Sequence, residues 1–430
     1  MGYRLSKFVT IVKKDGFFTA IKKVFKFIKA NYMSRINLFG RLKIKFRSKK
    51  IRKDIRNMLE GDYDRIIVWR SSFGWNVPLF QRPQHIARFL AKNRCLMFYE
   101  ITTVTDKVGA YKKIEDNLVL VNFLNIGMQK LLFEELKNAT KPKYMQYYST
   151  DTTLSVDEIK QFQEDGYKII YEYIDEISPD LLGVTELPEN LTGKYEYMIK
   201  DTEKTFVVVT ADKLEKDVVD RRGREKLVFS CNGVDYDHFA KLDKKVKLDD
   251  EFEKVIKEGK PIIGYYGAMA TWFDYDLLKY LAKERPDYNY VLIGIKYDGS
   301  FDEAHLEEYP NIHFLGPKDY QVLPYYATHF SVCTIPFLVN DITQATSPIK
   351  LFEYMALGKP IVTTAMNECK KYKSVMIAED KKDFLEKIEK AIKYEEENNK
   401  EYFDMLKEEA LDNTWETKAK LIIELIKKYE

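Results

Sequence analysis

Short apolar segments that alternate with helical stretches constrain the fold more than any other feature of this sequence. In the first half, strands are expected at residues 65–69, 94–100, 118–121, 168–173, 205–210 and 227–230. After a polar, charge-rich stretch, a second series is expected at 261–267, 290–294, 312–315, 330–335 and 359–364. Strands that alternate with helices form parallel sheets covered on both faces. We therefore predict an α/β protein with two doubly wound, Rossmann-like domains, for which 430 residues suffice.

Charge divides the chain into a basic N-terminus and an acidic remainder. The first 56 residues hold 18 Lys and Arg against two acidic residues, whereas the net charge of the whole chain is only +3. The basic charge is therefore local. We expect a basic amphipathic extension at 1–56, a first domain at 57–245, a second domain at 255–395 and a C-terminal helix at 396–430.

The basic extension has helical periodicity. Its apolar stripe is formed by Phe17, Ile21, Val24, Phe25 and Ile28, with lysines between them. An apolar stripe edged by ammonium groups is typical of a helix that lies on an anionic membrane, where each basic residue contributes about 1 kcal/mol. A helical arm packed on the protein's own body is an alternative. A nucleic-acid patch is a third, but no RNA- or DNA-binding motif accompanies the charge, so we expect no nucleic acid.

Other features favour a cytoplasmic protein. No apolar run reaches the length of about 18 residues that a spanning helix needs, and the N-terminus lacks the pattern of a secretory signal. The four cysteines are too far apart for a CxxC pair or a disulfide framework: Cys95, Cys231, Cys333 and Cys369. We expect a location at the inner face of the cell membrane, with the extension on the lipid.

One helix start carries the strongest sign of chemistry. Ser347 is expected to be the N-cap and Pro348 the first helical residue, with Ile349 beginning the buried face. Gly358 is expected to end the helix in a left-handed conformation. The free N–H groups at such a helix start bind anions. Lys350 lies in the first turn, where the helix dipole favours an anion rather than a cation. The position of this lysine is more easily explained if a phosphate lies nearby.

Glu353 follows Lys350 by three residues and therefore lies near it on the helix surface. Its carboxylate can accept two hydrogen bonds from a ribose diol. A solvated ion pair between Lys350 and Glu353 is the alternative, and these two residues alone favour it.

The segment from Ser347 to Val362 resembles the donor-site signature of GT-B glycosyltransferases, in the group-1-like set that builds bacterial surface polysaccharides. Six further segments resemble members of the teichuronic-acid and capsule type in the same order along the chain: residues 69–85, 170–175, 211–214, 231–235, 264–274 and 311–316. The resemblance covers roughly residues 65–425. It implies two domains that face a cleft, with the acceptor on the first and the donor on the second. It also implies that the helix around Trp415 crosses back to the first domain.

The resemblance implies roles for the donor-side residues. Glu353 would hold the ribose hydroxyls of a nucleotide-sugar. Lys350 and the amides after Ser347, with Pro348 and Ile349, would hold the diphosphate, where the charge of the leaving group develops. Gly267 lets the backbone approach the phosphates closely, and Lys296, after Gly294, is a further candidate cation.

Candidates for a general base lie in the first domain. Asp175 follows a buried strand, at the sheet edge where open α/β sheets present functional groups, although a cap or loop role is an alternative. His85 titrates near neutral pH without tuning, whereas Asp175 would need a raised pKa. Arg82 is a candidate contact for an anionic acceptor, with a cap or an ion pair as alternatives, and we place Trp75 on the acceptor side too.

One position departs from the family. Many retaining members carry Glu eight residues before the ribose-binding Glu, and this chain has Ala345 there, with only Asp341 and Thr343 as polar neighbours. The stereochemical outcome therefore stays open. The acidic run at 249–251 lies in the connection between the domains, where solvated charge is the better interpretation. We expect no metal site, no cofactor and metal-independent chemistry.

Together, these features predict a glycosyltransferase, of the hexosyl or deoxyhexosyl type. It would move a sugar from a nucleotide-sugar to a glycan or lipid-linked acceptor in cell-surface polysaccharide biosynthesis. Two alternatives remain open. One is a nucleotide-sugar epimerase of the same fold, and the other is a non-catalytic membrane-associated scaffold of a polysaccharide assembly complex.

Overall fold

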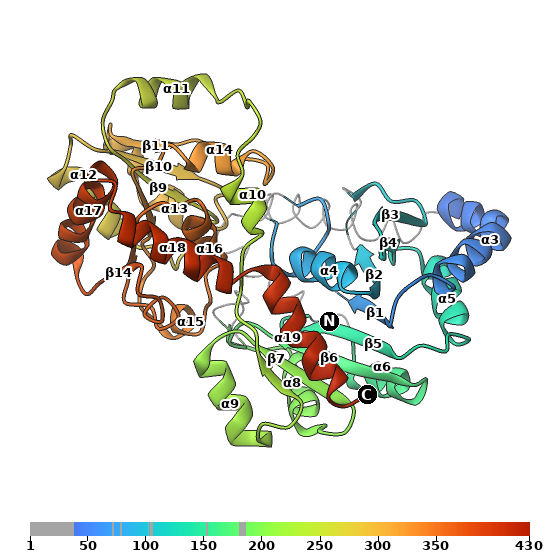
Figure 1. Cartoon of the computed structure of the whole chain (residues 1–430). Helices are drawn as coiled ribbons and strands as arrows, with labels where there is room; N and C mark the ends of the chain where they lie inside the picture. Colours follow the sequence, from blue (N-terminus) through green and yellow to red (C-terminus); the bar gives the residue numbers. More distant parts are fainter. Residues whose placement is uncertain are drawn as a thin grey trace.

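The computed structural model consists of two α/β domains with parallel sheets (Figure 1). It describes residues 38–430 apart from 71–72, 78–79, 102, 104–105, 152–153 and 180–185. The apolar stripe expected between residues 17 and 28 lies outside this part. The predicted fold class of two doubly wound domains is confirmed.

The first domain is built on an eight-stranded sheet, of which only the edge strand β3 runs antiparallel to its neighbour. The strands, in sheet order, are β3 (Tyr111–Glu115), β4 (Leu118–Asn122), β2 (Cys95–Ile101), β1 (Arg65–Arg70), β5 (Lys143–Tyr148), β6 (Tyr167–Tyr173), β7 (Thr205–Val209) and β8 (Leu227–Phe229).

Helices cover both faces of this sheet. Successive side chains of a strand point to opposite faces, so Val68 packs into one hydrophobic core and Trp69 into another. The first core receives side chains from α3 (Leu38–Leu59), α5 (Ile126–Leu136), α6 (Val156–Glu164), α8 (Glu189–Lys200) and α9 (Asp212–Arg222). The second core receives side chains from α4 (Arg82–Lys92) and α19 (Trp415–Lys427).

The second domain has a six-stranded, fully parallel sheet. Its strands, in sheet order, are β11 (Ile312–Phe314), β10 (Asn289–Ile293), β9 (Ile262–Tyr266), β12 (Val332–Ile335), β13 (Ile361–Thr364) and β14 (Val375–Ala378). Its helices are α10 (Tyr236–Ala240), α11 (Asp250–Lys257), α12 (Tyr275–Glu284), α13 (Ser300–Glu303), the 3₁₀ helix η2 (Leu306–Glu308), α14 (Leu323–Ala327), α15 (Asp341–Gln344), α16 (Ile349–Ala356), α17 (Lys381–Glu396) and α18 (Lys400–Asp412).

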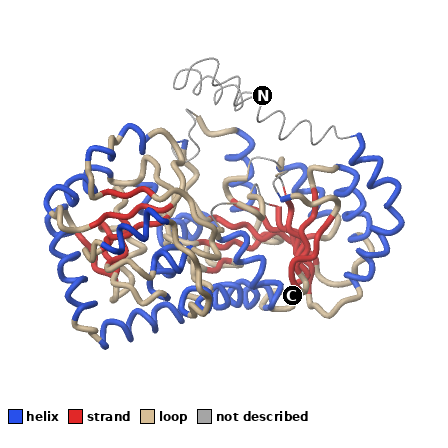
Figure 2. The backbone as a smooth tube through the Cα atoms, turned by 90° about the horizontal axis from the view of Figure 1, so that it is seen from above, coloured by secondary structure: helices blue, strands red, loops and turns tan. Residues whose placement is uncertain are grey.

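The C-terminal helices join the two domains. Figure 2 shows helices running along one side of both domains toward the C-terminus, which lies beside the first sheet. Leu406 of α18 is buried in the core of the second domain, whereas Trp415 and Ile422 of α19 are buried in the first. The last helix therefore connects the second domain to the first.

Several elements differ from the sequence-based expectation. Strands β3, β5 and β14 are additional, and the connection at 241–259 contains α11, whose Phe252 is buried in the second domain. α3 continues through residues 56 and 57, where a domain boundary was expected. The C-terminal segment forms three helices, of which α19 alone packs on the first domain. Within the described residues, no helix is long and apolar enough to cross a membrane.

Candidate functional site

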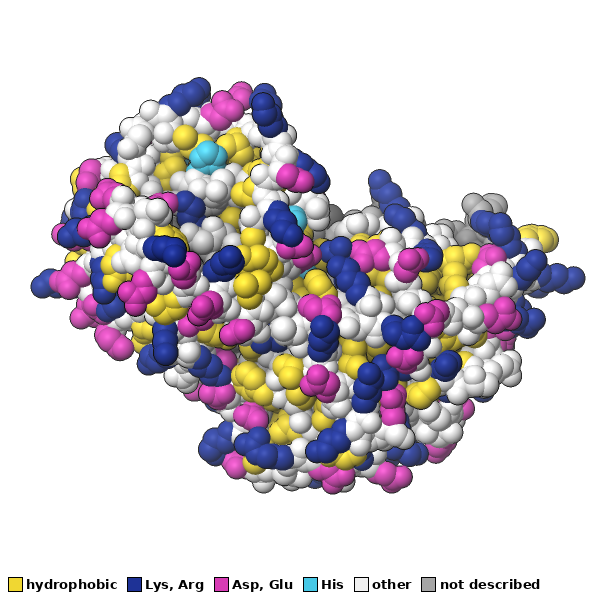
Figure 3. Space-filling model, viewed as in Figure 1, with side chains coloured by type: hydrophobic (Ala, Val, Ile, Leu, Met, Phe, Trp, Pro, Cys, Tyr) yellow, Lys and Arg dark blue, Asp and Glu magenta, His cyan; other side chains and the backbone are white. Residues whose placement is uncertain are grey.

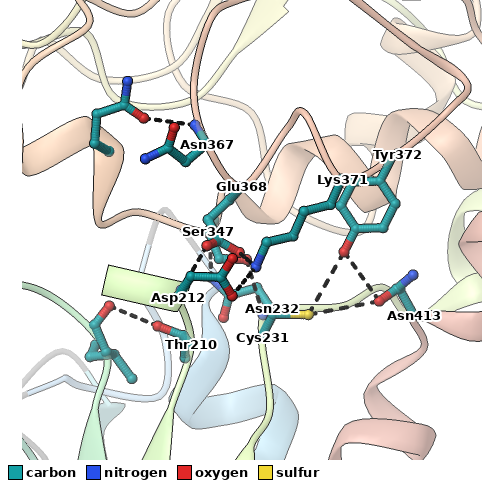
Figure 4. A network of polar contacts seen from close by, with 12 residues as sticks. Thr210, Asp212, Cys231, Asn232, Ser347, Asn367, Glu368, Lys371, Tyr372 and Asn413 are labelled. Atoms are coloured by element: carbon teal, nitrogen blue, oxygen red, sulfur yellow. Dashed lines mark hydrogen bonds and ion pairs between the residues drawn. The ribbon is translucent and has the colours of Figure 1, made fainter. Parts of the chain in front are cut away.

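The site is organised around the start of α16 in the second domain. The helix begins at Ile349, so Pro348 takes the N-cap position with an extended backbone (φ −72°, ψ 120°), and no side chain caps the helix. The prediction that Ser347 is the N-cap is wrong, because its Oγ accepts a hydrogen bond from the N–H of Asn232 at 3.2 Å. Asn232 Nδ2 also donates to the Ser347 carbonyl at 2.6 Å. The segment between the domains thus holds this helix start in place (Figure 4).

Gly358 ends the helix in a left-handed conformation (φ +66°), as the sequence predicts. The following strand, β13, then returns to the sheet. The whole helix has eight residues, and Leu351, Phe352 and Met355 are buried against the sheet. The first turn is therefore rigidly placed, while its amide groups stay uncapped by side chains.

Lys350 lies half-buried in the first turn of α16. Its Nζ is 4.9 Å from the ring centroid of Phe337 and 5.3 Å from that of Tyr265, so the ammonium contacts two aromatic faces. Within the described part of the chain, no carboxylate lies within ion-pair distance of it. Burial lowers the pKa of Lys350 to about 8. An anionic ligand beside Lys350 would stabilise its charged form.

Glu353 is buried one turn further along α16, with 5% of its surface exposed. Burial raises its pKa to about 7, and the nearby Tyr266 hydroxyl and Lys350 ammonium act in the opposite sense. Glu353 and Lys350 are not joined by an ion pair, and among the described residues neither has another charged partner. The alternative of a solvated ion pair therefore does not describe these two side chains.

Two buried hydroxyls lie near Glu353. The Tyr266 hydroxyl is close enough to lower the pKa of Glu353, whereas the Tyr320 hydroxyl has no hydrogen-bond partner in the described structure, and neither has Asn232 Oδ1 near the helix start. Burial and the charge of Glu353 both raise the pKa of each tyrosine, so the hydroxyls stay neutral. Buried polar groups are normally hydrogen-bonded, and each exception needs an explanation. A polar ligand with hydroxyl and phosphate groups would supply these partners.

Two glycines allow the strand ends to approach α16. Gly267 and Gly294 end β9 and β10 with φ +146° each, and a Cβ on Gly294 would lie 1.8 Å from the Gly267 carbonyl oxygen. A Cβ on Gly267 would lie 2.9 Å from Cε of Lys350. A side chain at position 267 would crowd the Tyr265 hydroxyl and Lys350, and the positive φ would add backbone strain, so both effects favour glycine there.

Lys296, the other candidate cation, is already paired. Its Nζ lies 2.7 Å from Asp302 Oδ1 and 4.4 Å from the ring centroid of Phe301. Lys296 therefore forms an ion pair within the second domain, and its charge is not free for a phosphate.

Asp175 lies just beyond β6 in the first domain and is half-buried. Within the described residues, its carboxylate has no hydrogen-bond or ion-pair partner, and burial raises its pKa to about 6. The backbone beside it is anchored, because Thr210 Oγ1 donates to the Ile174 carbonyl at 2.9 Å. A carboxylate of this kind has the properties of a general base near neutral pH.

His85, the second base candidate, is fully buried in α4. It stacks on Trp415 with ring centroids 4.8 Å apart, and both ring nitrogens lack a hydrogen-bond partner in the described structure. Burial and the nearby Arg88 hold its pKa well below the ordinary value, so the ring is neutral. In this conformation His85 is completely buried in an aromatic cluster between the domains with Phe80 and Tyr320.

The two acceptor-side candidates are also engaged inside the first domain. Arg82 Nε donates to Glu172 Oε2 at 2.9 Å, and Nη1 donates to the Cys231 carbonyl at 3.1 Å. This matches the ion-pair alternative for Arg82. Trp75 packs edge-on against Tyr99, with ring centroids 5.2 Å apart. Both side chains therefore make contacts within the first domain that stabilise its structure.

Ala345 is completely buried, and it packs into the core of the first domain although it belongs to the second. Of its polar neighbours, Thr343 donates to the Leu338 carbonyl at 2.5 Å, and Asp341 pairs with Lys213 of α9 at 3.3 Å. Position 345, where the resemblance implies Glu in retaining members, is thus used here for contact between the domains.

Metal-binding groups are not clustered in the described part of the chain: no set of three or more His, Cys, Asp and Glu side chains could hold an ion. Asp249 of the acidic run pairs with Lys318 at 2.7 Å. All four cysteines are buried and free.

Residues 260–394, which contain α16, match the family Glycosyl transferases group 1. The second domain is therefore similar to the group 1 glycosyltransferase domain over these residues. A candidate teichuronic acid biosynthesis glycosyltransferase of Bacillus subtilis (strain 168), TuaH, is 26% identical to the chain over 203 residues. This match covers 46% of the chain and 46% of TuaH, so the chain matches less than half the length of that relative.

Solved structures show the GT-B fold across both domains. Sucrose-phosphate synthase from Thermosynechococcus elongatus has a TM-score of 0.64 at 11% identity and covers 85% of this chain and 98% of its own. HepE of Anabaena, solved with UDP and glucose, has a TM-score of 0.59 at 14% identity, covering 85% and 100%. WaaG, a glycosyltransferase involved in lipopolysaccharide biosynthesis, has a TM-score of 0.52 at 13% identity, covering 83% and 97%.

Sequence reasoning missed several residues of the site. Tyr266 lies inside the family-like segment at 264–274, but nothing in the sequence shows that its hydroxyl is buried beside Glu353. Tyr320 and the contacts of Lys213 and Glu368 between the domains depend on residues more than 100 positions apart. Such contacts leave no local signal in a single sequence.

Proposed function

We propose that this chain is a glycosyltransferase that takes its sugar from a nucleoside diphosphate donor. The observation that carries the proposal is the unpartnered pair of Lys350 and Glu353 at the start of α16, inside a group 1 glycosyltransferase domain. A donor supplies what both lack: phosphate oxygens for Lys350 and ribose hydroxyls for Glu353. HepE is solved with UDP and glucose, which makes a UDP-hexose the first donor to test.

In this reaction the diphosphate lies at the uncapped start of α16, where the amides and Lys350 stabilise the negative charge of the leaving group. Asp175 removes the proton from the acceptor hydroxyl that attacks the anomeric carbon. The oxygen–carbon bond to the acceptor forms as the bond between the sugar and the diphosphate breaks. No metal ion is part of this scheme, because Lys350 and the amides supply the positive charge.

Calorimetry with UDP tests the donor site. We expect Glu353→Ala to weaken UDP binding about 10-fold or more, because a carboxylate that accepts two ribose hydroxyls contributes charge-assisted hydrogen bonds. Glu386→Ala is the matched control, since Glu386 is an exposed glutamate of α17 in the same domain. UDP affinity that is unchanged by Glu353→Ala, or release of UDP from UDP-glucose that EDTA abolishes and Mg²⁺ restores, would contradict the scheme.

The epimerase alternative differs in its need for an acceptor. An epimerase converts its nucleotide-sugar without any glycan, whereas a transferase consumes it rapidly only with an acceptor present. The scaffold alternative predicts neither UDP binding nor turnover. The retained pair of Lys350 and Glu353 favours an active donor site, and hence the transferase or the epimerase.

We also propose that the acceptor is lipid-linked and that α3 brings the enzyme to the cytoplasmic face of an anionic membrane. One face of α3 packs on the first domain through Ile44, Ile51 and Ile55. The opposite face carries Phe46, which is 86% exposed, and lysines at the helical spacing that places them beside it: Lys49, Lys50 and Lys53. Lys and Arg side chains gather at the end of the molecule where α3 lies (Figure 3).

Charge reversal on α3 tests this membrane surface. Deleting residues 1–56 would remove buried isoleucines of α3, so substitution is the cleaner experiment. We expect the triple variant Lys49→Glu, Lys50→Glu and Lys53→Glu to lose most of its binding to phosphatidylglycerol vesicles, because each lysine contributes about 1 kcal/mol at an anionic surface. Phosphatidylcholine vesicles should bind neither protein.

A matched control reverses three exposed lysines of the second domain, Lys254, Lys257 and Lys260. If both triple variants lose binding equally, the attraction is diffuse and α3 is not the docking surface. If the α3 variant binds like the wild type, the proposal for this helix is wrong.

A further inference from the structure

The start of α9 is held by the other domain. Ala211 occupies the N-cap position and has no side chain to cap the helix. Instead, the N–H of Asp212 donates to Glu368 Oε1 of the second domain at 2.9 Å. Lys371 pairs with both carboxylates, at 2.6 Å from Asp212 and 2.8 Å from Glu368 (Figure 4). Because an open helix start favours an anion, closure of the domains supplies the missing cap.

Lys213, the next residue of α9, extends this contact toward the candidate base. Its Nζ lies 2.6 Å from Glu176 Oε2 and 3.3 Å from Asp341 Oδ1. Glu176 directly follows Asp175, whereas Asp341 belongs to α15 in the second domain, on the segment that leads to Ser347. A single ammonium therefore joins the segment that carries the base to the segment that leads to the donor helix.

The segment around Asp175 is thus fixed on both sides by the start of α9. On one side, Thr210 donates to the carbonyl of Ile174, and this bond lies wholly inside the first domain. On the other side, Glu176 is held by Lys213, and the same ammonium reaches the second domain only when the two domains are in contact. The second restraint therefore depends on closure, whereas the first does not.

We propose that Lys213 is a positioning residue that couples contact between the domains to the placement of Asp175. This inference rests on the proposed function for its meaning in catalysis. When the domains separate, Asp341 withdraws, and Glu176 and the preceding Asp175 lose their connection to the donor side. When the domains meet, Lys213 draws Glu176 and Asp341 together, and Asp175 is held in one position. The base is then in place only when the donor helix is in place.

The charges around this site predict a pH readout. Asp175 lies close to the hydroxyl of Tyr148 on β5, whose other charged neighbours are Arg82 and Glu172. Glu176, the next residue of the chain, pairs with Lys213, which also pairs with Asp341 across the domain contact. Without the Lys213 ammonium, the negative charge of Glu176 is uncompensated next to Asp175 in the chain. That charge makes ionisation of Asp175 harder, so the acid limb of the pH–rate profile moves to higher pH.

The experiment compares Lys213→Met with Lys213→Arg and with Lys216→Met. Lys216 is a matched control because it is exposed on the same helix and its ion pair among the described residues lies within α9, with Asp220 at 2.6 Å. Three readouts are used: UDP affinity by calorimetry, release of UDP from UDP-glucose against pH, and hydrogen–deuterium exchange of the peptide at residues 174–179.

We expect Lys213→Met to lower kcat about 10- to 100-fold, the size of effect that a misplaced catalytic group produces, with UDP affinity within about twofold of wild type. The acid limb of its pH–rate profile should move to higher pH, and hydrogen–deuterium exchange at residues 174–179 should be faster. Lys213→Arg should recover most of the wild-type rate. Lys216→Met should match the wild type in all three readouts.

Three outcomes are decisive. Wild-type exchange and an unchanged pH profile in Lys213→Met would overturn the positioning role. A general loss of melting temperature that Lys213→Arg does not recover would show a merely structural role and overturn it too. If exchange at 174–179 becomes faster while wild-type protein neither binds UDP nor releases it from UDP-glucose, the proposed function fails and the coupling between the domains stands.

Discussion

At the scale of single residues, the site consists of charges that lack partners. Proteins rarely bury a charge without a partner, because desolvation disfavours the charged form. Here burial raises the pKa of Glu353 to about 7 and of Asp175 to about 6, and lowers that of Lys350 to about 8. Such shifts cluster at functional sites, and in this chain they occur at the residues that the sequence singled out.

The raised pKa of Glu353 makes a prediction for stability. Its folded pKa of about 7 lies above its ordinary value near 4.5, so the folded chain binds the proton more tightly. Stability from this group is therefore fully present below pH 4.5 and is lost as pH rises toward 7. We expect Glu353→Gln to stabilise the nucleotide-free protein at pH 8 by about 3 kcal/mol, measured by urea unfolding. At pH 4.5 the two proteins should be nearly equal, and a destabilised variant at pH 8 would contradict the burial argument.

At the scale of elements, α19 shows how the chain unites its domains. It leaves the second domain after α18 and buries Trp415, Ala419 and Ile422 against α4 of the first. Trp415 is completely buried and stacks on His85, whose ring also contacts Tyr320 of the second domain. The helix therefore connects the two domains and forms part of the core that the first domain builds with α4.

Removing the Trp415 side chain should destabilise the first domain, although Trp415 is distant from that domain in sequence. We expect Trp415→Ala to lower the free energy of unfolding by about 3–5 kcal/mol, the usual cost of deleting a buried aromatic side chain. Circular dichroism in urea measures the loss, and proteolysis should cut first within the first domain. Leu411→Ala, at a 44% exposed position of α18, should change stability by less than about 0.5 kcal/mol. Equal effects of both substitutions would show that α19 is not part of this core.

At the scale of the whole molecule, the donor site and the candidate base lie on different domains. Lys350 and Glu353 belong to the second domain, and Asp175 belongs to the first. The polar contacts of Asp212, Lys213 and Asn232 with the second domain bring the two parts together. Substrate binding and proton removal should therefore be separable by mutation.

Asp175→Asn should abolish turnover and leave nucleotide binding intact. General-base catalysis contributes about 10²- to 10⁴-fold, so we expect release of UDP from UDP-glucose to fall by at least 100-fold, with UDP affinity unchanged in calorimetry. In the wild type the rate should fall as pH drops below about 6, where Asp175 becomes protonated. Asp157→Asn, at an exposed position of α6, serves as the control. An Asp175→Asn variant with a wild-type rate would remove this residue from the reaction.

Most of the fold can be predicted from the sequence, because buried strands of parallel sheets are short apolar runs. β5 was missed because Lys143 and Gln146 interrupt its apolar pattern. The structure explains Gln146, which is buried and donates to Glu172 Oε1 at 2.6 Å. α11 was missed because charged residues dominate its sequence. Phe252 and Val255 are its buried residues, and two apolar positions give a weak helical pattern. In each case contacts with residues distant in sequence decide which side chains are buried.

The sequence by itself determined the fold class, the end of α16 at Gly358 and the positions of Lys350, Glu353 and Asp175 as candidates. These depend on local periodicity, on backbone conformation and on chemistry that neighbouring residues reveal. Only the tertiary structure decided that Ser347 bonds Asn232 instead of capping its helix and that His85 and Arg82 are buried in contacts of their own. It also decided that Lys350 and Glu353 have no ion-pair partner among the described residues. Whether a charge is paired depends on which side chains the fold brings beside it, and that information is spread over both domains.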